Sequence, residues 1–118
     1  MDEKFYRVVE FVTTFGKDDG KNESFENLKD FKDSNLLKAR EKALNYYNER
    51  YNGFLNSGKY FLPFSSPENF KPGKHASFSI SVYLVISEDF GETELPIKGE
   101  DEFSMEEGRA IEKEILET

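Results

Sequence analysis

The most regular pattern of hydrophobic and polar positions lies in residues 76–87, ASFSISVYLVIS. Apolar side chains fill the even positions of this stretch, and four of its odd positions are serine. Alternation with a period of two predicts a β-strand over about 76–88 that is buried on one face and wet on the other. We interpret the serines as a solvated face. The alternative is that these small side chains leave room for a partner protein, a second subunit or an aromatic loop of the same chain.

Residues 4–15, KFYRVVEFVTTF, are apolar on much of both faces of a predicted strand. One face holds Phe5, Val9, Phe11 and Phe15, and the other holds Tyr6, Val8 and Val12. A strand that is apolar on both faces favours a central place in a sheet. Asp19-Gly20 then predicts a turn. A weaker strand is predicted over about 23–31, although its apolar residues are spaced by three, which does not suit a strand.

Helical spacing of apolar residues predicts a helix over about 34–52, with Asp33 or Ser34 as its N-cap. Gly53 is expected to end it in the left-handed conformation, with Phe54 folding back on the last turn. Residues 53–75 then form a long connection with three prolines and five aromatic residues. Part of YFLPF within it is expected to form a short edge strand, with Pro63 at an unpaired position.

The last quarter of the chain predicts a second strand and a second helix. Residues 93–98 are expected to form an edge strand, because they contain Pro96. Ser104 and Glu107 have the spacing of a capping box, and a helix is expected over about 105–117. The element order predicts one α+β domain over residues 1–118: an antiparallel sheet of three to five strands with both helices packed on one face.

Charge is distributed unevenly along the chain. Residues 1–87 hold 12 acidic and 13 basic residues, whereas residues 88–118 hold 12 acidic and 3 basic residues, which gives net charges of +1 and −9. A field of this sign repels double-stranded nucleic acid and anionic membranes, and it attracts basic protein surfaces. Simple solubility is the alternative explanation.

Several kinds of chemistry are disfavoured by composition. The chain has no cysteine and one histidine, His75, so a thiol site is excluded and a zinc site is not expected. Phosphate-binding glycine motifs are absent, and Asp89-Phe90-Gly91 resembles the kinase magnesium motif by chance, because the chain is too short for a kinase. We expect no catalytic residue, cofactor or metal, and a cytoplasmic location, because the N-terminus lacks an apolar signal region.

The leading functional hypothesis is a small acidic protein that binds other proteins and is not an enzyme. The acidic segment would steer a basic partner, and aromatic residues of the long connection would anchor it. The candidate partner-binding residues are Tyr60, Phe61, Phe64, Glu106, Glu107, Glu112 and Glu114.

Two alternatives remain at this point. One is a small-molecule-binding domain or an enzyme with a pocket under the 53–75 connection, in which His75, Tyr83 and Ser81 would be the polar groups. The other is self-association through the serine face or an edge strand, giving a homo-oligomer.

Overall fold

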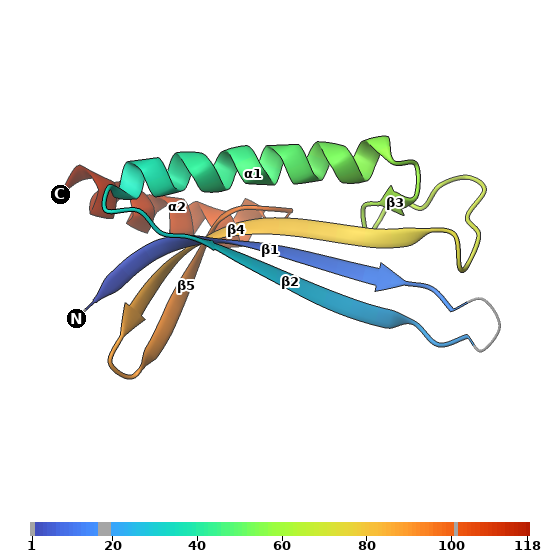
Figure 1. Cartoon of the computed structure of the whole chain (residues 1–118), viewed down its shortest axis with the longest axis horizontal. Helices are drawn as coiled ribbons and strands as arrows, with labels where there is room; N and C mark the ends of the chain where they lie inside the picture. The colour runs from blue at the N-terminus through green and yellow to red at the C-terminus, as the bar shows by residue number, and fades with distance from the viewer. Residues whose placement is uncertain (1, 17–19, 101) are drawn as a thin grey trace.

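The computed structural model describes residues 2–16, 20–100 and 102–118. It confirms an α+β fold with two helices and a five-stranded, mostly antiparallel sheet, drawn out to 52 × 28 × 25 Å (Figure 1). The elements are β1 (Glu3–Thr14), β2 (Glu23–Phe31), α1 (Leu36–Asn56), β3 (Tyr60–Phe61), β4 (Ala76–Glu88), β5 (Gly91–Lys98) and α2 (Glu102–Glu117).

Strand β1 lies between β2 and β4, as its two apolar faces predicted. It pairs antiparallel with both of them, so that Val9 lies opposite Leu28 on one side and Ser81 on the other. The far side of β4 is shared by two strands. The short strand β3 runs parallel to the start of β4, and β5 runs antiparallel to its end. The weakly predicted strand over 23–31 is confirmed as β2, whereas the Asp19-Gly20 turn lies partly outside the described residues.

The alternating pattern of β4 separates a buried face from an open one. Its side chains at positions 78, 80, 82 and 84 are at most 1% exposed and pack with Tyr6 and Val8 of β1 beneath α1. Ser77, Ser79 and Ser81 lie on the opposite face and are partly exposed. The predicted two-sided character of this strand is therefore confirmed.

Helix α1 begins and ends later than the sequence predicted. Its N-cap is Asn35, whose side chain accepts a hydrogen bond from the backbone N–H of Leu37, instead of Asp33 or Ser34. Asp33 instead accepts from the Asn35 backbone N–H and pairs with Lys42. The helix is stabilised along its length by residues that are buried against the sheet: Ala39, Ala43, Tyr47 and Phe54.

The expected helix end at Gly53 was wrong. Helix α1 continues through Gly53 to Asn56, because Phe54 in its last turn packs on Phe78 with ring centroids 4.7 Å apart. Ser57 caps the end, and its hydroxyl donates to the Phe54 carbonyl. The positive φ belongs to Gly58, at 75°. A buried aromatic contact thus outweighed the local preference of Gly53 for a helix end.

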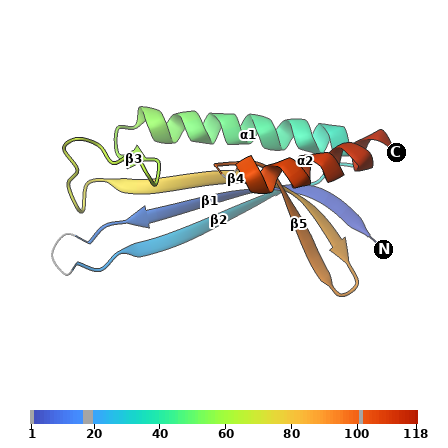
Figure 2. The same cartoon turned by 180° about the vertical axis from the view of Figure 1, so that it is seen from behind.

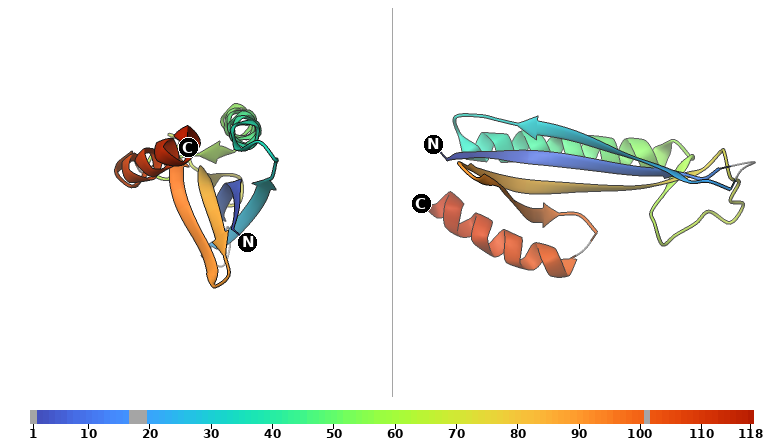
Figure 3. Two further views of the ribbon diagram at one scale, coloured as in Figure 1. Left: turned by 90° about the vertical axis from the view of Figure 1, so that its left-hand side faces the viewer. Right: turned by 90° about the horizontal axis from the view of Figure 1, so that it is seen from below.

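The two helices do not pack together on one face of the sheet, so that part of the prediction was wrong. Helix α1 covers β1 and β4, while α2 packs against β5 (Figures 2 and 3). The 21 residues of α1 span roughly 30 Å and already cover the face of the sheet that β1 and β4 form. Helix α2 instead approaches β5 closely at Gly108, where an added Cβ would lie 2.0 Å from the Pro96 carbonyl oxygen. It also begins before Ser104, which places the predicted capping box inside the helix.

Candidate functional site

The three loop aromatics proposed as anchors have different surroundings. Phe61 is buried and stacks on Phe15, and Tyr60 is half-buried against Phe54. Phe64 is fully exposed. The predicted edge strand is confirmed as β3, which contains Tyr60 and Phe61. Of the three residues, Phe64 therefore offers the most accessible ring to a partner.

The four acidic residues proposed on α2 also separate into two groups. Glu106, Glu107 and Glu114 are exposed. Glu112 is only 4% exposed, and its carboxylate accepts hydrogen bonds from the Tyr6 hydroxyl at 2.8 Å and the Arg40 Nε at 3.1 Å. Glu112 therefore joins α2 to β1 and α1, and lies outside the accessible acidic surface.

The structure does not bring the loop aromatics and the acidic helix together. Figure 2 shows β3 and its loop at one end of the molecule and the C-terminus of α2 near the other. With a long axis of 52 Å, the two groups belong to separate surfaces.

A second buried glutamate, Glu10 of β1, was not identified from the sequence. It is 3% exposed and receives two hydrogen bonds from Arg50 of α1, at 2.7 and 2.9 Å, and one from the Tyr46 hydroxyl at 3.3 Å. The same carboxylate raises the pKa of Arg50, whose charged form it stabilises. One signal for Glu10 was present: it interrupts the apolar series Tyr6, Val8 and Val12 on the face that α1 covers.

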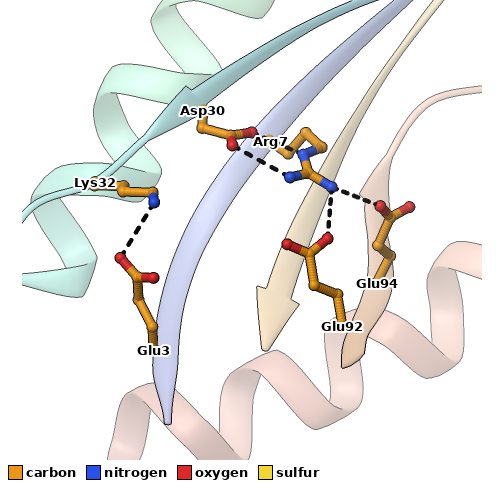
Figure 4. Close-up of polar contacts among 6 residues, drawn as sticks. All are labelled: Glu3, Arg7, Asp30, Lys32, Glu92 and Glu94. Carbon is orange, nitrogen blue, oxygen red and sulfur yellow. Dashed lines mark hydrogen bonds and ion pairs between the residues drawn. The ribbon is translucent and has the colours of Figure 1, made fainter. Parts of the chain in front are cut away.

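Arg7 of β1 binds carboxylates of β2 and β5 on the open face of the sheet (Figure 4). Its guanidinium binds Asp30 of β2 through two nitrogens, and binds Glu92 and Glu94 of β5 at 3.0 and 2.8 Å. These carboxylates, first of all Asp30, raise the pKa of Arg7. Because β1 and β4 lie between β2 and β5, this clamp joins the two outer strands across the open face at one end of the sheet. It also engages two carboxylates of the acidic segment.

At the other end of the open face, apolar side chains are exposed. Phe11 and Leu28 lie there on neighbouring strands, with 41% and 53% of their surface exposed. The serines of β4 border Phe11 on the side away from β2, with Ser79 opposite Phe11. Their side chains are too short to lie over the ring.

Strand β2 borders this region as a long edge strand. It pairs with β1 without interruption from Glu23 to Phe31, and its other edge has no partner strand among the described residues. Residues 23–30 are all exposed. Phe25, on the α1 side of the sheet, is 57% exposed.

A cavity of about 600 Å³ lies beside β3 and His75. It is lined by Lys59, Tyr60, Lys74 and His75, among others. The pocket alternative therefore has a concavity at His75. Tyr83 and Ser81 do not line it, since they lie on the open face of β4.

The chain matches no protein-family model, no curated protein and no solved structure. Its function is therefore inferred from its own surfaces. The described His, Asp and Glu residues form no group suited to a metal ion. Neither helix, as far as its residues are described, is long and apolar enough to cross a membrane.

Proposed function

We propose that this chain is a non-enzymatic protein-binding protein that adds an extended segment of a partner to the free edge of β2. The observation that carries the proposal is that β2 pairs with β1 alone, so that its other edge has no partner strand among the described residues. A free edge strand presents unpaired backbone groups that a second strand can pair with.

Edge strands are often guarded by proline, by bulges or by charged side chains, of which lysine is the most effective. Strand β2 contains no proline, and its register with β1 has no shift. Its one lysine, Lys29, lies over the rings of Tyr46 and Phe31, with its Nζ 4.6 and 5.5 Å from their centroids. Lys29 therefore points toward α1 and does not guard the edge.

The side chains along β2 define the chemistry of the partner. Phe25 and Leu28 are exposed on opposite faces, so that an added strand would cover one of them on each side. Asp30 is engaged by Arg7, whereas Glu23 and Glu26 have no ion-pair partner among the described residues. A segment with apolar residues and a basic residue near Glu26 fits this edge.

The test compares three charge-introducing variants of exposed apolar residues. Phe25→Lys places a lysine at the edge on the α1 side, and Phe11→Lys places one on the open face, one strand away from the edge. Leu37→Lys, on the exposed side of α1, is the matched control, since Leu37 is 58% exposed. Each variant serves as bait in a host lysate at low and high salt, with bound proteins identified by mass spectrometry.

Strand addition predicts that Phe25→Lys loses the partner, while Phe11→Lys and Leu37→Lys retain it. Docking onto the open face predicts instead that Phe11→Lys loses the partner and Phe25→Lys retains it. The proposal is refuted if Phe25→Lys retains every protein that the wild type retains, or if the wild type retains none. Light scattering of the purified variants identifies a second copy of the chain as the partner, if Phe25→Lys alone shifts a dimer to monomer.

A further inference from the structure

The cavity beside β3 combines three features that point to an anionic ligand. Its volume of about 600 Å³ is within the range of small-molecule sites. Its lining includes two lysines and a histidine, Lys59, Lys74 and His75, and the less polar residues Tyr60 and Ala76. No carboxylate is among these groups.

The cations at the cavity lack internal partners. Neither Lys59 nor Lys74 forms a salt bridge or a side-chain hydrogen bond within the described residues. By contrast, Arg7, Arg40 and Arg50 are each bound to carboxylates. Among the described residues, no carboxylate is bound to Lys59 or Lys74, so their charges are available to a ligand.

The cavity wall is held in place by the loop that follows β3. Gly73 donates its backbone N–H to the Phe15 carbonyl at 2.9 Å, and Ala76 donates to the Lys59 carbonyl at 2.9 Å. The ring of Phe70 packs edge-on against Phe15 at 5.1 Å and stacks on His75 at 5.9 Å. Lys59 and Lys74 are thus carried on two segments that are fixed to each other.

The hydrogen bond to His75 sets which of its nitrogens can bind a ligand. The Lys71 backbone N–H donates to Nδ1 at 2.8 Å, so Nδ1 is an acceptor and the neutral ring carries its proton on Nε2. Nε2–H remains as a donor for a ligand oxygen. The ring is also held by Phe70, so this donor is preorganised.

We propose that this cavity binds small molecules with a phosphate or carboxylate group attached to a flat apolar body. Lys59 and Lys74 hold the anion, His75 donates a hydrogen bond from Nε2, and the body lies against Tyr60. This site is independent of the β2 edge, so the two proposals stand or fall separately.

The test is an amide NMR titration of the full chain with phenyl phosphate, benzoate and inorganic phosphate. We expect saturable shifts at Gly58, Gly73 and His75 with the two aromatic anions, and weaker binding of inorganic phosphate. Comparison of phenyl phosphate with benzoate identifies the preferred anion. The double variant Lys59→Gln/Lys74→Gln should weaken binding at least about tenfold, because charge-assisted hydrogen bonds are lost.

The matched control is Lys38→Gln/Lys113→Gln, which removes the same charge from the exposed surfaces of α1 and α2. It should bind like the wild type. The proposal is wrong if the aromatic anions give no saturable shifts around the cavity at millimolar concentration. It is also wrong if both double variants weaken binding equally, since that would reflect the overall field of the protein. The amide spectrum of each variant shows whether it is folded.

Discussion

Substitution of Gly108 by alanine tests the close contact between α2 and β5. The added Cβ would lie 2.0 Å from the Pro96 carbonyl oxygen and 3.0 Å from its carbonyl carbon. Both atoms belong to the backbone of a paired strand, so neither can turn aside. Ordinary contact needs roughly 1.4 Å more separation, which requires α2 to move away from β5.

The magnitude follows from three contributions. Overpacking costs about 1–3 kcal/mol. Movement of α2 also lengthens the bonds from Tyr6 and Arg40 to Glu112, which now measure 2.8 and 3.1 Å, and buried groups that lose partners cost about 1–3 kcal/mol. Alanine returns about 1 kcal/mol through its higher helix propensity. The free energy of unfolding should therefore fall by about 1–5 kcal/mol.

Gly53→Ala is the matched control, because it is the same substitution within a helix but has no atom within 4 Å of the added Cβ. It should raise the free energy of unfolding by about 0.5–1 kcal/mol. Urea denaturation followed by far-ultraviolet circular dichroism measures both variants. A Gly108→Ala protein as stable as the wild type, or stabilised like Gly53→Ala, would show that α2 does not pack on β5 as described.

Three further predictions concern the buried and clamped charges. Glu10→Gln should lower the free energy of unfolding by about 1–2 kcal/mol, since it removes the charge that Arg50 binds bidentately while Arg50 remains partly solvated; an unchanged urea midpoint would contradict this. Burial and the Glu112 carboxylate raise the pKa of Tyr6 above its ordinary value. The stability that the protonated Tyr6 contributes is therefore complete below about pH 10, and it is lost as the pH rises further, because the unfolded chain releases the proton first. Tyr6→Phe should therefore make the decline of stability above that pH less steep, and an equal slope in both proteins would refute the assignment. Arg7→Lys should lower the free energy of unfolding by about 1–2 kcal/mol, because a lysine cannot reproduce the bidentate contact with Asp30. It should also speed amide hydrogen exchange in β5, and unchanged exchange there would mean that Arg7 does not hold that strand.

The regular strands could be predicted because their side chains alternate between a covered face and an open one. Strand β2 was harder, since its apolar residues serve both faces. Phe25 and Phe31 point to the α1 side and Leu28 to the open side, which produces a spacing of three. The position of α2 could not be predicted from its apolar stripe, Met105, Gly108, Ile111 and Ile115. Such a stripe shows that one side of a helix is covered but not by which element. A mid-helix glycine on that stripe was a sign of close packing.

The buried glutamates show why the candidate site could be predicted only in part. A glutamate is rarely buried unless paired, so a surface place for Glu112 was the default expectation. Its partners Tyr6 and Arg40 lie 106 and 72 residues away in the sequence. Only the folded chain brings such groups together. The same holds for Phe61, whose burial depends on Phe15 and Phe70 arriving from other segments.

The serine positions of β4 explain why the open face differs between its two ends. Near the start of β1, Phe5 is only 2% exposed, and the cationic groups of Arg7 and Lys32 lie over its ring at 5.4 and 4.7 Å. Long charged side chains can cover apolar surface in this way, whereas serine cannot. Phe11 has Ser79 as its neighbour on β4 and stays 41% exposed. The bare polar face is thus the physical reason that an apolar surface remains accessible next to the free edge of β2.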